Sequence, residues 1–451
     1  RMTDEALAIA GSGAAAYLDA AGIIAAAREA GCDAIHPGYG FLSENAAFAS
    51  LCRDAGLIFV GPRPETLALF GDKAEARRFA ALHKVPVIPG TPGPTTVDEA
   101  RAFMASLGPG AAVMVKAIAG GGGRGMRPVT DAQQLAATME RCRSEAAHAF
   151  GNGDVYVERL FPRARHIEVQ IMGDGTGTVS HLWERECSLQ RERQKVLEIA
   201  PAPFLRPAVR DRLLRAATRL AAAGKYLNAG TFEFLVDAGV GTGADSDEAA
   251  IAFIEANVRL QVEHTVTEEI TGIDLVQAQL NIAAGARLDD LGLRQQDIPA
   301  PRGMAIQARV NLETMQADAS VRSAGGVISV YEQPSGRGVR VDGYGYAGYR
   351  TNPRFDSLMA KVIVHAVTPK FADAAAKAER ALAEFRVAGV ATNIAFLRAL
   401  LRDPEVLAGG MHTRFIDENA GALIAAQPES ARYFAAQAAS AQRRPGVKLE
   451  T

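Results

Sequence analysis

Helical and strand-like hydrophobic patterns alternate along the first part of the chain. Residues 18–30 and 44–55 carry apolar stripes with the helical period, and short apolar strands at 34–35 and 57–60 follow them. This alternation predicts the remnant of a parallel, doubly wound layer. Ligands of such layers lie beyond the carboxyl ends of the strands, so the loop 36–40 is either a tight turn or part of a site.

A stretch rich in proline and glycine at 86–94 indicates a boundary, and a smaller unit follows it to about residue 160. A glycine-rich loop, 120–125, lies in the middle of this unit. The surrounding pattern predicts strands at 113–117 and 126–129, a helix at 131–150 and a strand at 155–158.

Beyond residue 161 the pattern becomes that of hairpins. Residues 166–172 alternate between apolar and polar, turn at 173–175 and return through 178–183, which implies a sheet with one polar face. The tail from residue 425 is rich in Ala, Gln and Ser, as linkers between domains are. Between them the pattern predicts a helix at 209–223, strands at 230–237 and 251–264, and a turn insertion at 239–247.

The composition is that of a globular protein, since 48% of the 451 residues are hydrophobic and 22% are charged. Lys plus Arg (49) nearly balances Asp plus Glu (51), so the basic excess that nucleic-acid binding needs is absent. The four cysteines form no CxxC pair, which argues against a disulfide framework or a zinc site and fits a reducing cytosol. No apolar run approaches the ~18 residues of a membrane span. The first residues, from Arg1 onward, are typical of the middle of a domain, so we expect an N-terminal truncation.

The loop 120–125 satisfies the pattern GxGxxG, but a dinucleotide fingerprint opens directly into a helix and here a strand follows. The Walker sequence GK[ST] does not occur either. Glycine amides that cap a hairpin can still close over phosphates, and Lys116 on the preceding strand can place its ammonium on the same group. Without that lysine, a structural turn would be the favoured interpretation.

The segment Glu255-Ala-Asn257-Val-Arg259-Leu-Gln261-Val-Glu263 alternates polar and apolar residues. If the whole segment is one strand, its polar residues share one face. A solvated face would favour Thr, Lys and Ser, whereas this row supplies metal ligands, an amide, a guanidinium and a base. We therefore interpret the row as the floor of an active site.

Glu233 lies between two phenylalanines in a similarly apolar strand, and a hairpin of the two strands would bring it opposite Glu255. Facing carboxylates repel unless a cation joins them, and oxygen ligands beside a phosphate loop favour Mg²⁺ over zinc. Two surface glutamates are the less favoured alternative. The segment 191–195 is by default a solvated loop, and among the histidines only His166 stands out, because it lies on the polar face of its strand.

Several short sequences together indicate a family. They are His36-Pro-Gly-Tyr-Gly-Phe-Leu-Ser-Glu-Asn45, Gly71-Asp-Lys73, Lys116 with Gly120 to Met126, Arg165-His166-Ile-Glu-Val-Gln170, Gln194-Lys195-Val196, Gly230-Thr-Phe-Glu233-Phe and Arg259-Leu-Gln261-Val-Glu263-His264. Over nearly its whole length the chain resembles the biotin carboxylases, the ATP-grasp components of biotin-dependent carboxylases. The resemblance implies an α/β ATP-grasp fold with a partial N-terminal doubly wound domain (1–87), a small lid (88–160), a C-terminal domain with a mixed or antiparallel sheet (161–424) and a linker-like tail (425–451).

The resemblance also implies roles for individual residues. Those for ATP are Lys73, Lys116, Gly122, Gly123, Glu158, Arg159, Leu160, His166 and Arg193. Those for bicarbonate are Lys195, Arg259, Gln261, Val262 and Glu263; those for biotin are Tyr39 and Arg309; and those for Mg²⁺ or Mn²⁺ are Glu233, Glu255 and Asn257. The catalytic set is Lys195, Arg259, Glu263 as general base, and Arg309 as the group that stabilises the biotin enolate.

The implied reaction is the ATP- and bicarbonate-dependent carboxylation of biotin. Bicarbonate, deprotonated by Glu263, attacks the γ-phosphorus of ATP to give carboxyphosphate and ADP. Carboxyphosphate decomposes to CO₂ and phosphate, phosphate deprotonates biotin N1, and N1 attacks CO₂. Three departures indicate a divergent branch: the missing N-terminal strand-helix-strand segment, Arg193 where a histidine is common, and Leu-Glu-Thr-Met after Asn311 together with the insertion at 239–247.

The sequence contains no Ala-Met-Lys-Met biotinylation motif, so we expect the biotin on a separate carrier or a further region, with a carboxyltransferase as the second partner. A homodimer or higher oligomer in the cytoplasm is expected, without nucleic-acid or membrane partners. An acyl-CoA acceptor is favoured over pyruvate or urea on overall similarity. Two alternatives stay open: another ATP-grasp carboxylate-amine ligase, which would not need the row from Arg259 to Glu263 with Arg309, and a noncatalytic nucleotide-binding module.

Overall fold

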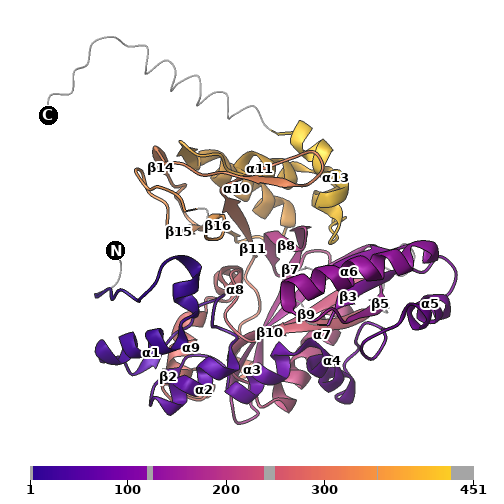
Figure 1. Ribbon diagram of the computed structural model, residues 1–451. Helices are drawn as coiled ribbons and strands as arrows, with labels where there is room; N and C mark the ends of the chain where they lie inside the picture. Colours follow the sequence, from indigo (N-terminus) through magenta and orange to yellow (C-terminus); the bar gives the residue numbers. More distant parts are fainter. Residues whose placement is uncertain (1–3, 119–124, 238–248, 353, 428–451) are drawn as a thin grey trace.

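The computed structural model describes residues 4–118, 125–237, 249–352 and 354–427 (Figure 1). Within these residues the largest sheet has eight strands in the order β10-β9-β6-β7-β8-β11-β16-β15, and all of its neighbouring strands are antiparallel. The strands are β6 (Ala164–Asp174), β7 (Val179–Arg191), β8 (Gln194–Ala200), β9 (Leu227–Asp237), β10 (Ile251–Asn257), β11 (Met304–Asn311), β15 (Val339–Gly343) and β16 (Leu358–Ala366).

The N-terminal part is the small parallel layer that the sequence predicts. Strand β1 (Ala34–Ile35) pairs in parallel with β2 (Ile58–Phe59). Its helices are a 3₁₀ turn (Gly13–Leu18), α1 (Ala20–Glu29), α2 (Ala46–Asp54), α3 (Pro64–Gly71) and α4 (Lys73–Leu82). Asn45 caps α2 by accepting a hydrogen bond from the Phe48 amide, and Asp72 caps α4 in the same way, so both helices begin where their polar caps stand.

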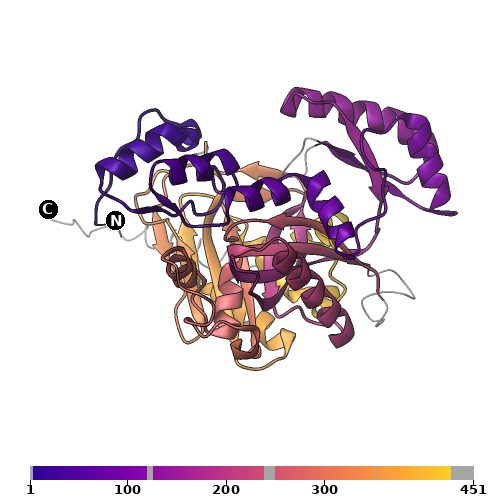
Figure 2. The same ribbon diagram turned by 90° about the horizontal axis from the view of Figure 1, so that it is seen from below.

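A three-stranded sheet, in the order β4-β3-β5, forms a separate lobe with two helices on it. Figure 2 shows that this lobe projects away from the rest of the molecule. Its elements are α5 (Val97–Ser106), β3 (Val113–Ala117), β4 (Met126–Val129), a 3₁₀ turn (Ala132–Gln134), α6 (Leu135–Phe150) and β5 (Val155–Arg159). The alternating burial of Val113 and Val115 against Met139 and Val157 gives the lobe a core of its own.

Two apolar cores lie against the large sheet. Helix α7 (Pro207–Ala223) packs on the apolar side chains of β6 and β9, including Ile167, Val169 and Phe232. Helices α10 (Phe371–Glu384) and α11 (Ile394–Arg402) cover β11 and β16 in the same manner, as seen in the upper part of Figure 1. The polar side chains of the central strands are thereby left to pair with one another.

Smaller elements complete the chain. They are α8 (His264–Thr271), α9 (Leu275–Ala283), a 3₁₀ turn (Gln295–Asp297), β12 (Glu313–Met315), β13 (Val321–Ser323), β14 (Val330–Glu332), β17 (Arg386–Ala388), α12 (Pro404–Leu407) and α13 (Phe415–Ala425). Among the described helices, none combines the length and the apolar character that a bilayer crossing requires.

One predicted element is wrong in part. The strand expected over 251–264 ends at Asn257, and residues 258–263 form a loop that leads directly into α8. Beyond Asn257 the chain leaves its ladder partner β9, whose register with β10 closes at the pair of Asn257 and Thr231. The alternation of polar and apolar residues beyond Asn257 is therefore not the pattern of a continued strand. It belongs to a loop whose polar side chains contact other elements.

Candidate active site

The polar residues of β6 form the base of the candidate site. The apolar residues Ile167, Val169 and Ile171 of this strand enter the core beneath α7, so the alternate residues point to the other face. There His166, Glu168 and Gln170 are buried rather than solvated. Since a buried polar group must be hydrogen-bonded or paired, neighbouring strands supply the partners of these side chains.

Lys195, on β8, is the centre of this buried network. Its ammonium lies 2.6 Å from Glu168 Oε2, 3.0 Å from Glu233 Oε1 and 2.5 Å from Glu263 Oε1. Burial works to lower the pKa of Lys195, but these three carboxylates raise it well above its usual value. Lys195 is therefore a permanent cation in the site, and the prediction of a solvated loop fails for this residue.

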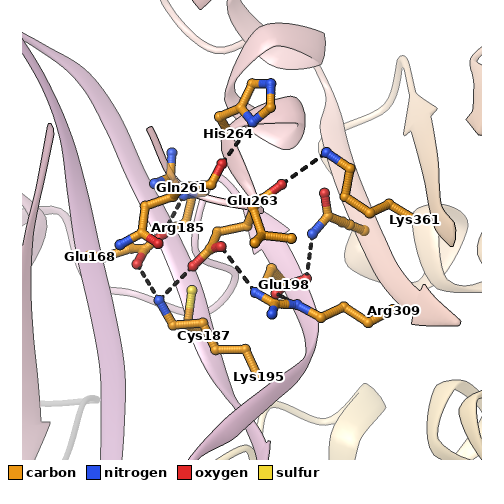
Figure 3. Close-up of polar contacts among 12 residues, drawn as sticks. Glu168, Arg185, Cys187, Lys195, Glu198, Gln261, Glu263, His264, Arg309 and Lys361 are labelled. Carbon is orange, nitrogen blue, oxygen red and sulfur yellow. Dashed lines mark hydrogen bonds and ion pairs between the residues drawn. The ribbon is translucent and has the colours of Figure 1, made fainter. Parts of the chain in front are cut away.

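Glu263 lies between two cations, as Figure 3 shows. Its Oε1 contacts Lys195 and its Oε2 lies 3.0 Å from Arg309 Nη2 on β11. Burial favours the protonated acid, yet Lys195 and Arg309 outweigh it and hold the pKa of Glu263 far below its usual value. The Nε of Arg309 in turn lies 2.5 Å from Glu198 Oε1. The arrangement keeps Glu263 ionised and places it beside two fixed positive charges.

Glu233 has partners from three elements. His166 Nε2 lies 2.7 Å from its Oε2, and Asn257 Nδ2 donates to its Oε1 at 2.6 Å. Gln261 adds a longer contact of 3.4 Å to the same oxygen. Burial works to lower the pKa of His166, but Glu233 raises it. The two predicted metal ligands Glu233 and Asn257 are thus in direct contact with each other.

The loop 258–263 keeps its polar residues together although it is not a strand. Arg259 Nη1 donates to Gln261 Oε1 at 3.0 Å, and its Nη2 lies 3.3 Å from Asn257 Oδ1. The Nε of Arg259 also reaches Glu44 Oε1 at 3.5 Å, which connects the loop to the N-terminal layer. These contacts place Arg259 and Gln261 beside the carboxylate of Glu233.

The expected hairpin of the two acidic strands is present, with Glu255 opposite Glu233 in the register of β10 and β9. Glu255 is paired with the ammonium of Lys73 at 2.7 Å, and its side chain is 31% exposed. Carboxylate and amide oxygens on Glu233, Glu255 and Asn257 form a donor set of the kind that Mg²⁺ prefers. The residues present therefore fit a magnesium ion by their chemistry, with Lys73 and Lys195 as the groups that now neutralise the carboxylates.

A different acidic group, of His166, Glu168 and Glu233, also has ligand atoms within 4.8 Å of one another among the described residues. Each of its carboxylates already contacts the Lys195 ammonium, and Glu168 is paired with Arg185 as well. Because these cations already balance the negative charge, the group does not require a metal ion for its stability.

Lys116, on the strand β3 of the lobe, contacts the carboxylate of Glu158, which also pairs with Arg77. Burial, and then the positive charges of Lys73 and Arg77, lower the pKa of Lys116 to about 7. Glu255 favours the charged form of Lys116 but does not outweigh these effects, and the contacting Glu158 is shared with Arg77. A cluster of cations with too few acidic partners is suited to binding phosphate groups.

A cleft of about 920 Å³ separates the lobe from the β7–β8 turn and α13. Leu160 and Arg193, both assigned to ATP by the resemblance, line this cleft. Arg193 donates to the carbonyl of Met126, and burial lowers the pKa of Arg193. Arg159 is exposed and lies with its guanidinium 5.4 Å from the ring of Phe161. Of the predicted nucleotide residues that the structure describes, Leu160 and Arg193 are the two that line this cleft.

Three further predicted residues complete the picture. Gly122 and Gly123 lie outside the described residues. Tyr39, in the loop after β1, is 42% exposed. Burial raises the pKa of its hydroxyl, and the positive charge of Arg309 opposes this rise.

Several residues of the network are not among the sequence predictions. Glu168 pairs with both Lys195 and Arg185, and Glu198 pairs with Arg309. All three of Glu168, Arg185 and Glu198 are fully buried. The available signal is a charged residue inside an otherwise apolar strand, as in Val196-Leu-Glu198-Ile. The same signal marks Lys361, in the apolar strand β16.

Family models match most of the chain. They are "Biotin carboxylase, N-terminal domain" over residues 1–67, "Carbamoyl-phosphate synthase L chain, ATP binding domain" over 72–291 and "Biotin carboxylase C-terminal domain" over 307–418. The mitochondrial pyruvate carboxylase of Homo sapiens is 49% identical over 406 residues, which is 90% of this chain and 33% of that protein. The chain thus spans about a third of the length of the curated relatives it matches.

Solved structures are similar over nearly the whole chain. The biotin carboxylase domain of a single-chain bacterial carboxylase has a TM-score of 0.81 and 47% identity, with 95% of this chain and 89% of that chain covered. The biotin carboxylase domain dimer of Hydrogenobacter thermophilus 2-oxoglutarate carboxylase has a TM-score of 0.82 and 38% identity, with 90% and 86% covered. That structure contains MgADP, ADP and bicarbonate.

Proposed function

The chain belongs to the biotin carboxylase family of ATP-dependent ligases, and we propose that it catalyses the carboxylation of carrier-bound biotin with ATP and bicarbonate. This is the first half-reaction of a biotin-dependent carboxylase. The observation that carries the proposal is the position of the Glu263 carboxylate between Lys195 and Arg309. A carboxylate there can accept a proton, while both cations offset the negative charge that develops beside it.

We assign the bicarbonate site to the residues around Glu263. Arg259 and Gln261 contact each other beside Glu233, and Lys195 contacts both Glu233 and Glu263. A small anion in this space would meet the Lys195 and Arg259 cations and the amide of Gln261. Glu263 would then take the proton of bicarbonate at a carboxylate oxygen and leave a better nucleophile for phosphoryl transfer.

Arg309 is assigned to the biotin step. Its positive charge acts on the hydroxyl of Tyr39, whose exposed side chain marks the side from which a carrier could deliver biotin. Its guanidinium is held by Glu198 and Glu263, so it is fixed in place before biotin arrives. A fixed guanidinium can stabilise the enolate oxygen that forms when biotin N1 loses its proton.

For ATP, we assign Lys116 and Lys73 to the phosphates and the cleft beside Leu160 and Arg193 to the base. Glu233, Glu255 and Asn257 would hold Mg²⁺, which when bound supplies positive charge to the phosphate oxygens. Lys73 lies beside Glu255 and can move its ammonium from that carboxylate to a phosphate. The lobe of β3, β4 and β5 is the part that would close over the nucleotide, so residues 88–160 remain the proposed lid.

The molecule that finally accepts the carboxyl group from biotin is a separate question. The expected acyl-CoA carboxylase type is not confirmed, because the curated relatives described above are pyruvate carboxylases. We propose a 2-oxo acid such as pyruvate as the acceptor, used by a carboxyltransferase that receives carboxybiotin from a biotin carrier. A homodimer remains the proposed assembly, supported by the dimeric H. thermophilus relative. The cytoplasm remains the proposed location. The name of the human relative, by contrast, places that protein in mitochondria.

The decisive experiment measures ADP release with and without bicarbonate, and then with added free biotin. We expect ATP cleavage that depends on bicarbonate and increases with biotin, together with labelled carboxybiotin from labelled bicarbonate. Glu263→Gln should abolish the activity, whereas Glu332→Gln, an exposed carboxylate far from the site on β14, should not. ATP cleavage that requires an amine instead of bicarbonate would favour a carboxylate-amine ligase, and nucleotide binding without turnover would favour a noncatalytic module.

A further inference from the structure

Lys361 is a charged residue in the middle of an apolar strand. It lies on β16, where its neighbours Ala360 and Val362 are buried against the core under α10. The Lys361 side chain is itself only 7% exposed. A buried ammonium is costly unless it is paired and hydrogen-bonded, so its partners reveal what the residue does.

The ammonium of Lys361 donates to the backbone carbonyl of Val262 at 3.0 Å. Figure 3 shows the side chain extending from its strand toward the segment that carries Gln261 and Glu263. A second, longer contact of 3.4 Å joins it to Asp342, its cross-strand partner on β15. Lys361 thus connects the large sheet to the loop 258–263 through a main-chain oxygen.

The side chains of Arg259, Gln261 and Glu263 contact other elements, so the restraint that Lys361 adds is one on the main chain of the loop. The loop has left the β-ladder at Asn257, and no side chain caps the N-terminus of α8 at Glu263. His264 Nδ1 contacts the Gln261 carbonyl at 2.7 Å, which is a restraint from within the same segment. Because a peptide group is planar, holding the Val262 carbonyl also fixes the orientation of the Glu263 amide and α-carbon.

The anchor itself is held in place. Arg340 Nε donates to Asp342 Oδ1 at 2.9 Å, and its Nη1 contacts Glu268 Oε2 on α8 at 2.7 Å. The contacts therefore run from Glu268 through Arg340 and Asp342 to Lys361 and then to Val262. Both ends of this chain lie on the segment formed by the loop and α8, so the loop is fixed relative to its own helix and to the sheet.

We propose that Lys361 is a positioning residue for the bicarbonate step: by holding the Val262 carbonyl, it keeps the Glu263 carboxylate in place between Lys195 and Arg309. The expected change in bicarbonate use rests on the proposed function. The expected loosening of the loop 258–263 does not depend on that function. Lys361 contacts the main chain of Val262, the residue next to Glu263, and therefore acts on Glu263 through the backbone. Its removal should affect the use of bicarbonate more than that of ATP.

The test compares Lys361→Met, which keeps the length of the side chain and removes the donor, with Lys361→Arg, which keeps a donor. Lys377→Met is the matched control, because Lys377 also donates to backbone carbonyls, those of Arg337 and His365, but does not touch the loop. We expect Lys361→Met to raise the bicarbonate KM about tenfold, the effect of losing one hydrogen bond to a charged donor. The ATP KM should change less than twofold, Lys361→Arg should recover part of the loss, and Lys377→Met should leave both constants unchanged.

A second readout does not depend on activity. Amide hydrogen exchange of residues 258–264 should be at least about tenfold faster in Lys361→Met than in the wild type, with no such change in Lys377→Met. Unchanged exchange in this segment, or equal increases in both KM values, would overturn the role of Lys361. A wild-type protein without bicarbonate-dependent turnover would instead overturn the proposed function, and if Lys361→Met fails to fold, Lys361→Gln is measured in the same way.

Discussion

The ammonium of Lys195 lies 2.5 Å from Oε1 of Glu263, and the same ammonium also contacts Glu168 and Glu233. One cation thus joins the proposed general base to the carboxylate proposed for the metal. This relationship has a consequence for the pH dependence of the site. The ionised state of Glu263 depends on Lys195 and Arg309, because burial alone would favour the neutral acid.

The first prediction concerns the acidic limb of the pH profile. In the wild type, the pKa of Glu263 is lowered, so its carboxylate stays ionised as the pH falls and should not limit turnover above about pH 5. In Lys195→Met the strongest opposing charge is gone, so burial should raise this pKa. As the pH falls, the residual bicarbonate-dependent ATP cleavage of this variant should then begin to decline at a pH at least about one unit higher than in the wild type. Superimposable acidic limbs would contradict this assignment.

The second prediction separates the two half-reactions. Arg309→Ala removes the guanidinium proposed for the biotin enolate but leaves the contact of Lys195 with Glu263. Carboxybiotin formation should fall about a hundredfold or more, whereas bicarbonate-dependent ATP cleavage should fall about tenfold or less. Arg309→Lys should resemble the alanine variant, since a lysine cannot make both contacts of the planar guanidinium. ADP release and labelled carboxybiotin are measured on the same samples, and a loss in constant proportion would argue against separate roles.

The third prediction concerns the proposed metal ligands. Glu255 is partly exposed, so Glu255→Gln should keep the fold and require a much higher Mg²⁺ concentration for turnover. Glu233→Gln should show the same loss and also lower the thermal unfolding midpoint, because His166 and Lys195 lose a buried counter-charge worth about 3 kcal/mol. The measurements are a Mg²⁺ titration of activity and a thermal melt. Equal melting of the two variants, or a normal Mg²⁺ titration in either, would speak against the proposed difference.

The fourth prediction concerns ATP binding and Lys116. Its pKa of about 7 in the free protein should rise when phosphate oxygens approach, so ATP binding should take up a proton above pH 7. The affinity for ATP should then be highest below pH 7, where Lys116 is already charged in the free protein. It should decrease as the pH rises, by up to about tenfold per pH unit. Calorimetry in buffers of different ionisation enthalpy measures the proton uptake.

Two variants control this measurement. Lys116→Gln should bind ATP without the uptake assigned to this residue. Lys73→Met should keep the uptake and move it to higher pH, because one of the positive charges that lower the pKa of Lys116 is lost. Proton uptake that persists in Lys116→Gln would mean that another group titrates.

Much of the architecture could be predicted from periodicity alone. The strands at 113–117 and 126–129 occur with the predicted limits, and the hairpin of β6 and β7 turns where the glycines stand. Local patterns suffice in such cases because a strand or a turn is stabilised mainly by the residues within it and beside it. The opposition of Glu233 and Glu255 also follows, since their two strands are consecutive along the chain and pair as predicted.

The site needed the tertiary structure. Alternation in the segment 255–263 predicted one long strand, yet the chain turns into α8 after the loop, because the contacts of Arg259 and Glu263 come from other elements. Lys195 lies in a sequence with the composition of a solvated loop, and only the approach of β6, β9 and the loop 258–263 makes it the partly buried partner of three carboxylates. The amino-acid pattern alone establishes which polar residues are available and on which strands most of them lie. The packing of the sheet decided which of them meet, because burial forces each charge to find its partner across the fold and such partners are far apart along the chain.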